Sequence, residues 1–155
     1  MKTPAEKQNR TPGRTISLDI GTKTIGVAVS DELGVTANGV CTVSRENEKK
    51  DLAQLRDIID EYSPCEILVG IPYNQDGSLG SRAKSIRRFS ERIRDSLGLP
   101  VKYWDESFST KTAEQTLIEA GMGRRKRKTV IDKMAATVIL EEYLLSRNQL
   151  TSGQT

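Results

Sequence analysis

The chain of 155 residues carries 24 lysines and arginines against 21 aspartates and glutamates, a net charge of +3, and it contains no histidine. The missing histidine excludes a Ser-His-Asp triad, a Cys-His dyad and any histidine-ligated zinc site. No apolar run is long enough to span a bilayer and no apolar signal segment opens the chain, so we expect a single cytoplasmic domain.

Three strands are predicted near the start of the chain. Residues 1–13 are polar and contain two prolines, which is typical of a disordered leader. Alternating apolar residues predict strands at about 15–20 and 24–30, joined by a tight turn, and a third strand at about 35–43. Because the connections are short, we expect an antiparallel meander.

The middle of the chain alternates helices with strands. Apolar residues at helical spacing predict a helix that ends at Ser63-Pro64, followed by a buried strand at 66–71. Turn-forming residues over 72–81 predict a long loop, and the apolar stripe from Ala83 to Leu97 predicts a second helix. A fifth strand is expected at about 101–104.

Two helices are predicted for the last third of the chain, over about 110–120 and from about Thr129 to Arg147, with residues 148–155 as a polar tail. The order of elements predicts an α/β fold with a mixed five-stranded sheet. Three antiparallel strands come first, parallel strands follow, helices flank the sheet, and the first strand lies centrally. Cys41 and Cys65 lie in or beside strand-like runs and are expected to be buried free thiols.

Asp19 is a carboxylate within an otherwise apolar strand. A charge in such a place is costly unless it is paired or binds a cation. Two interpretations stay open from the local sequence: Asp19 accepts hydrogen bonds from the amides of Gly21 and Thr22 in the turn, or it is a ligand for a cation.

Other carboxylates are expected to approach Asp19. Asp105 and Glu106 end the fifth strand on opposite faces, and ligands of open α/β sheets gather at such strand ends. At least one of the two is expected only to end the strand. Asp132 shares a helix face with Ala135 and Ala136, small residues that let this face pack on the sheet; alternatively, it completes an N-terminal cap that begins at Thr129.

Widely separated acids that meet at one place need a cation to hold them there. Oxygen ligands without histidine or thiolate favour Mg²⁺ or Mn²⁺. Two such ions activate a water and stabilise the leaving oxygen of a phosphodiester.

Four segments resemble, in this order, the motifs of the YqgF family. This family comprises ribonuclease H-like proteins described as Holliday junction resolvase-like or as pre-16S ribosomal RNA nucleases. The resemblance implies a ribonuclease H-like nuclease domain over 14–147, divalent-metal-dependent hydrolysis of a nucleic acid backbone, and a cytoplasmic setting. The segments are LDIGTKTIGVA (18–28), GIP (70–72) with DGS (76–78), DES (105–107) and DKMAA (132–136).

By motif, the catalytic and metal-binding acids of that family fall on Asp19, Glu106 and Asp132. Asp19 is then expected to bridge the ions, the other two to complete the ligand set, and Asp105 to assist from beside them. The family usually has an arginine where this chain has Ser107. The absence of that arginine would weaken contact with phosphate or change which of Asp105 and Glu106 points inward.

Clusters of cations are candidates for substrate binding. A basic run precedes the last predicted helix; such runs are usually solvated surface, but this one lies beside the expected site. With Lys23, it is expected to hold the substrate backbone. Further cations line the helix that contains Arg82, and Tyr73 and Trp104 could either stack on bases or pack in the protein. The run consists of Arg124, Arg125, Lys126, Arg127 and Lys128.

The predicted function is that of a metal-dependent nuclease acting on structured nucleic acid, in maturation of pre-16S ribosomal RNA. The alternatives are a resolvase of four-way DNA junctions and a binding module that grips nucleic acid without cutting. The turn after Asp19 also resembles the phosphate-binding hairpin of actin-like ATPases, but those enzymes need a second domain that this chain is too short to provide. Monomer and homodimer both remain open.

Overall fold

The first half of the chain forms an antiparallel meander. The computed structural model describes residues 13–106 and 119–152, without the side chains of 124–133 and 149–152. Strand β1 (Thr15–Ile20) pairs antiparallel with β2 (Thr24–Ser30), and β2 pairs antiparallel with β3 (Ala37–Ser44). The predicted meander is confirmed, although β3 begins slightly later than expected.

The rest of the chain adds parallel strands through helical crossovers. Helix α2 (Glu48–Tyr62) leads to β4 (Glu66–Ile71), and helix α3 (Ser81–Leu97) leads to β5 (Val101–Asp105). Strand β4 pairs parallel with both β1 and β5, which gives the strand order β3-β2-β1-β4-β5. The mixed five-stranded sheet with β1 at its centre is therefore confirmed.

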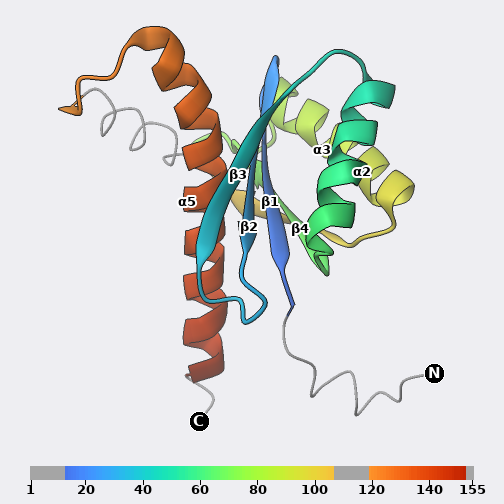
Figure 1. Ribbon diagram of the computed structural model, residues 1–155, viewed down its shortest axis with the longest axis vertical. Coiled ribbons are helices and arrows are strands. Elements are labelled where there is room, and N and C mark those ends of the chain that lie inside the picture. Colours follow the sequence, from blue (N-terminus) through green and yellow to red (C-terminus); the bar gives the residue numbers. More distant parts are fainter. Residues whose placement is uncertain (1–12, 107–118, 153–155) are drawn as a thin grey trace.

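Helices cover both faces of this sheet. Figure 1 shows α2 and α3 on one side and the long helix α5 (Arg124–Ser152) on the other. Strand alternation explains the division, because successive side chains point to opposite faces. Ile16, Leu18 and Ile20 pack in the core under α2 and α3, whereas Ala28 and Leu68 pack with α5.

Helix ends follow ordinary capping chemistry. The Asn47 side chain accepts a hydrogen bond of 3.0 Å from the Lys50 amide and begins α2. Helix α3 ends at Gly98, which adopts a left-handed φ of 71° that glycine tolerates without steric cost. The glycine signal made the end of α3 predictable, whereas the start of α2 at Asn47 was not predicted.

Helix α5 is longer than predicted. It begins at Arg124 rather than near Thr129, so the basic run forms its first turns instead of preceding it. The N-terminal cap reading of Asp132 is therefore wrong, since this residue lies well inside the helix. Helix α5 also continues past Arg147 to Ser152. Most of the helix predicted over 110–120, and the predicted leader up to residue 12, lie outside the described residues.

The two cysteines are free, as expected, but only Cys41 is partly buried. The expectation of two buried thiols is wrong for Cys65, which is exposed because it lies in the connection between α2 and β4 rather than within a strand. Its Sγ approaches the carbonyl oxygen of Arg14 at 3.3 Å.

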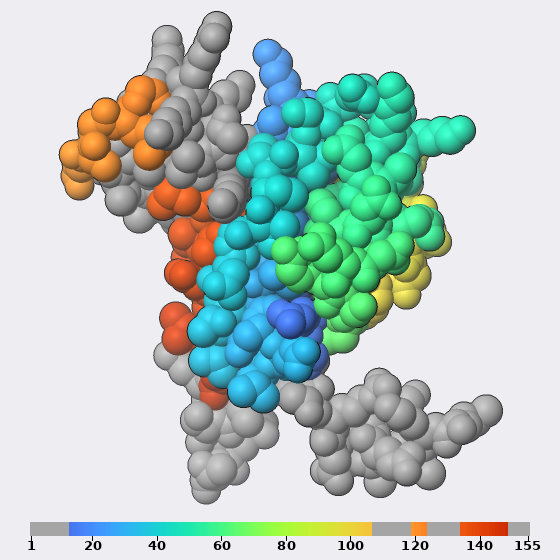
Figure 2. Space-filling model, viewed as in Figure 1, coloured from blue at the N-terminus to red at the C-terminus, as the bar shows by residue number. Residues whose placement is uncertain are grey.

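Strand β3 forms one edge of the sheet and lies at the surface between α5 and α2 (Figure 2). Most of its side chains are exposed or partly exposed. Among the described residues, no helix has the length and apolar character needed to cross a membrane.

Candidate active site

Two of the predicted acids meet at the carboxyl ends of β1 and β5. Asp19 is the penultimate residue of β1, and Glu106 directly follows the last residue of β5. Strand β4 lies between them, pairing with β1 at Leu18↔Val69 and with β5 at Ile71↔Asp105. The parallel pairing therefore aligns these strand ends and brings the two carboxyl groups into hydrogen-bonding contact.

The turn after Asp19 is closed by its own backbone. The amide of Gly21 donates a hydrogen bond of 2.7 Å to the Thr24 carbonyl oxygen. A Cβ at Gly21 would lie 2.8 Å from that same oxygen, so the turn requires glycine at this position. Gly21 is thus explained by the turn, while Asp19 faces Glu106.

Glu106 is held in a space that Gly70 leaves open. Its amide donates to the Ile71 carbonyl oxygen at 3.1 Å, and the residue is only 9% exposed. A Cβ at Gly70 would lie 2.6 Å from both Glu106 Oε2 and Ile139 Cδ1. In the sequence, Gly70 is recognisable only as part of the GIP motif, which gives no sign of this role.

The electrostatic environment favours the protonated form of Glu106. Burial, the negative charge of Asp19 and a hydrogen bond shared with Asp19 raise the pKa of Glu106 to about 9. The guanidinium of Arg82 acts in the opposite direction, and Asp105 adds a further small increase. At neutral pH without a cation, the two carboxyl groups therefore retain a shared proton.

The acid pair has the chemistry of a cation site. Glu106 Oε2 is buried and accepts no hydrogen bond within the described part of the chain. A buried carboxylate oxygen of this kind is costly unless a cation or donor reaches it, and hard divalent cations take oxygen ligands. The described side chains contain no cluster of three potential metal ligands, but the Asp132 side chain is not among them. The residues present fit a divalent cation.

Asp105 lies on the other face of β5, as strand alternation predicts. It is exposed, whereas Glu106 is buried. Of the two neighbouring acids, Glu106 is the one in contact with Asp19.

The backbone of α5 places position 132 near the height of Asp19. The Ser17 hydroxyl donates to the Ala136 carbonyl oxygen at 2.9 Å, and Arg147 lies nearer the start of the sheet, on Glu66. Helix α5 therefore runs antiparallel to β1. Asp19 lies ~7 Å along the strand from the Ser17 contact, and position 132 lies ~6 Å along the helix on the same side.

The structure describes only some of the side chains that were predicted to bind substrate. Lys23 is exposed in the turn directly after Asp19. The basic run is helical, but its side chains lie outside the described set, and so does all of Ser107. Trp104 packs edge-on against Tyr143 with ring centroids 5.8 Å apart and donates from Nε1 to Glu142, and Tyr73 packs against the core. These aromatic residues therefore have packing roles.

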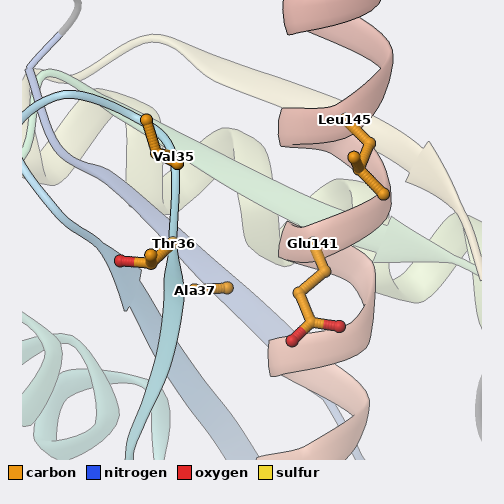
Figure 3. Close-up of a pocket in the computed structure, with 5 residues that line it drawn as sticks. All are labelled: Val35, Thr36, Ala37, Glu141 and Leu145. Atoms are coloured by element: carbon orange, nitrogen blue, oxygen red, sulfur yellow. The ribbon is translucent and has the colours of Figure 1, made fainter.

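A separate surface pocket of about 420 Å³ lies at the other end of β2 from Asp19 (Figure 3). The segment leading into β3 forms one wall and α5 forms the other. Its lining contains a single carboxylate and no cation, so it offers no group for phosphodiester chemistry. It is lined by Val35, Thr36, Ala37, Glu141 and Leu145.

Comparison with known proteins identifies close relatives. The family described as "RuvX: Holliday junction resolvase" matches residues 13–146. A relative from Geobacillus kaustophilus, named "Putative pre-16S rRNA nuclease", is 54% identical over 136 residues, covering 86% of this chain and 99% of its own length. A relative of the same name from Halothermothrix orenii is 50% identical over 137 residues, covering 88% and 98%.

Solved structures share the fold at low sequence identity. RuvC from T. thermophilus in complex with a Holliday junction substrate is similar with a TM-score of 0.52 and 15% identity, over 87% of this chain and 95% of that one. The yeast mitochondrial Holliday junction resolvase Ydc2 gives a TM-score of 0.55 and 11% identity, over 91% and 81%. These likenesses show the ribonuclease H-like fold.

Proposed function

This chain belongs to the RuvX family of Holliday junction resolvases, and we propose that its nuclease activity serves the maturation of pre-16S ribosomal RNA in the cytoplasm. The two relatives described above, both of which carry the pre-16S name, match over nearly their whole length with at least half of the aligned residues identical. The single structural observation that supports the proposal is the contact between Asp19 and Glu106 at the strand ends.

Three acids form the proposed metal site: Asp19, Glu106 and Asp132. The first two are in contact, and α5 carries the third position to the same height. All three offer oxygen ligands, which Mg²⁺ and Mn²⁺ prefer. When bound, such ions supply activation of a water and stabilisation of the leaving oxygen of a phosphodiester.

The residues of the chain prepare this chemistry. Glu106 would release its shared proton to solvent when a cation is bound, since the positive charge offsets the burial and the repulsion from Asp19 that raise its pKa. Gly70 leaves the space beside Ile139 that the carboxyl group of Glu106 occupies. Lys23 and the first turns of α5 bind the substrate backbone through phosphate contacts, which position a nucleic acid without reading its sequence.

A four-way DNA junction is the second candidate substrate. The description of the matching family favours it, as does the junction bound to the structurally similar RuvC. Symmetric cutting of a junction would require a homodimer, whereas processing of a single RNA strand would not.

Cleavage of labelled substrates tests the proposal. A pre-16S RNA fragment and a four-way DNA junction are incubated with Mg²⁺, with Mn²⁺ and with EDTA, using wild-type protein and Asp19→Asn. The proposal predicts metal-dependent cutting of the RNA that the variant loses. Exclusive cutting of the junction would reassign the substrate, and binding without cutting of either would contradict the nuclease proposal for both substrates.

A further inference from the structure

Arg82 reaches from α3 across to the strand end that carries Asp19. It is the second residue of α3, and its Nη2 donates a hydrogen bond of 2.6 Å to the carbonyl oxygen of Ile20. Ile20 directly follows Asp19 in the chain. The guanidinium is therefore anchored one residue away from the proposed metal ligand.

The same guanidinium also acts on the second acid. Its positive charge favours the ionised form of Glu106, which places it close enough to the acid pair for a direct electrostatic effect. Arg82 is thus bonded to the residue after Asp19 and lies within electrostatic reach of Glu106, although α3 and α5 cover opposite faces of the sheet.

Arg82 differs from Arg45, the other arginine bonded to this turn, in having N–H donors and a charge that are not already paired. Arg45 donates to the Gly21 carbonyl oxygen at 2.7 Å, but its charge is paired with buried Asp51 at 3.4 Å and it stacks on Phe89. Arg82 is exposed, and within the described residues it forms no salt bridge and one hydrogen bond. A guanidinium has five N–H donors, so most of them can reach a ligand.

We propose that Arg82 is a substrate-contacting residue of this nuclease site: its guanidinium, fixed on the Ile20 carbonyl oxygen, binds a non-bridging oxygen of the phosphate under attack. The proposal rests on the nuclease function proposed above. Planar guanidinium groups recognise phosphate oxygens well, and anchoring on a backbone oxygen orients the fork before substrate arrives.

Arg82 has a binding role in the hydrolysis and gives up no proton. A bond forms between the water oxygen and phosphorus, and the bond between phosphorus and the leaving nucleotide oxygen breaks. The proton released by the water passes to solvent, and the leaving oxygen takes one from solvent. Negative charge on the non-bridging oxygens is held by Arg82 throughout, most strongly in the transition state.

The substitutions Arg82→Gln and Arg82→Lys test this role, with Lys84→Gln as the matched control. Lys84 is an exposed cation two residues further along α3. We expect Arg82→Gln to lower kcat by about 100-fold, the usual effect of removing one preorganised donor to a transition state, with a smaller rise in KM from the lost contact to bound substrate. We expect Arg82→Lys to retain only part of the wild-type kcat, because one ammonium cannot hold both the carbonyl oxygen and the phosphate in a fixed fork.

A metal-binding measurement separates substrate contact from support of the acids. Mn²⁺ affinity is determined by electron paramagnetic resonance without nucleic acid. Unchanged Mn²⁺ affinity in Arg82→Gln together with the lowered kcat supports the proposal. Loss of Mn²⁺ affinity that accounts for the whole loss of kcat overturns it, and so does a kcat equal to that of Lys84→Gln.

A binding measurement keeps the test decisive if the wild-type protein cuts neither substrate, the result that would contradict the proposed function. Affinity for the labelled junction and the RNA is then measured by fluorescence anisotropy with CaCl₂ over a range of salt concentrations. A phosphate contact by Arg82 predicts that Arg82→Gln reduces the slope of log affinity against log salt by about 1. An unchanged slope overturns the proposal, whatever the activity.

Discussion

At the scale of single residues, the site depends on the space that Gly70 leaves for Glu106. Gly70→Ala would bring a methyl group within 2.6 Å of Glu106 Oε2 and of Ile139 Cδ1. Overpacking of this kind costs about 1–3 kcal/mol, and here it also displaces a proposed metal ligand. We expect Gly70→Ala to lower the free energy of unfolding in urea by that amount and to lower cleavage at least tenfold.

Gly123→Ala is the control for this substitution, because a Cβ there meets nothing within 4 Å. It should leave both stability and cleavage near the wild-type values. Full activity in Gly70→Ala would show that Glu106 does not need its observed position.

The residue pattern predicted that Asp19 meets the acidic end of the fifth strand and that Asp105 and Glu106 lie on opposite faces, while the choice of Glu106 came from the family resemblance. The role of Gly70 and the anchor of Arg82 were not predicted. Both depend on contacts between residues far apart in the chain, such as the bond from Arg82 to Ile20, and a local pattern contains no information on such a contact. The contribution of Asp132 stays a prediction.

At the scale of elements, a buried hydrogen bond ties α5 to β1 near position 132. The fully buried Ser17 hydroxyl donates to the Ala136 carbonyl oxygen. Ser17→Ala removes this donor, and we expect a loss of about 1 kcal/mol in the free energy of unfolding, measured with urea. Metal affinity should also fall, since the bonded contact nearest position 132 would be lost. Ser85→Ala, an exposed serine of α3, is the control.

A cluster around Glu66 joins the starts of β1, β4 and β5 to α5. Thr15 and Tyr143 donate to Glu66 Oε1 at 2.8 and 2.9 Å, and Lys102 lies 3.0 Å from Oε2. Burial raises the pKa of Glu66, but the hydrogen bonds from Thr15, Lys102 and Tyr143 outweigh burial and hold the pKa below its ordinary value. The ionised form is therefore the one that the fold stabilises.

The sign of the pH dependence follows from this lowered pKa. The stabilisation is fully present above the ordinary carboxyl pKa and is lost as pH falls through the lowered pKa of the folded state. We expect the free energy of unfolding to decline with acidity below about pH 4.5, and Glu66→Gln to decline less steeply there. Parallel curves for the two proteins would contradict the role given to this cluster.

The start of α5 was predicted too late in the chain. Five consecutive cations suggested a solvated connection, yet lysine and arginine are good helix formers and no proline or glycine follows Gly123 before the helix end. Helical propensity therefore extends the helix through the run. The C-terminal ends of α2 and α3 were easier to predict, because proline and glycine signal them locally, whereas the cap at Asn47 was not predicted.

At the scale of the whole molecule, the acid pair links stability to metal. Asp19→Asn removes a charge that repels Glu106. In EDTA we expect the variant to have a higher Tm than the wild-type protein. Saturating Mg²⁺ or Mn²⁺ should raise the wild-type Tm by several degrees, since a ligand at 100 times its Kd contributes about 2.7 kcal/mol, and should not raise that of the variant. Differential scanning calorimetry measures both effects, and equal metal-induced shifts would place the cation elsewhere.

The topology as a whole was predictable, since the order of strands and helices and the right-handed crossover rule leave few arrangements. The position of the candidate site at the strand ends was therefore also predictable, because parallel pairing aligns the ends that carry Asp19 and Glu106. The pocket at the opposite end of β2 was not predicted, because it arises from packing between a loop and α5.

The most direct test of the account is the anomalous scattering of Mn²⁺ in a crystal of this protein soaked in MnCl₂. The account predicts an anomalous peak bonded to the carboxylate oxygens of Asp19, Glu106 and Asp132, lost in Asp19→Asn crystals soaked in the same way. A fully soaked crystal with no peak among these carboxylates, or with its peaks at other acids, would contradict it.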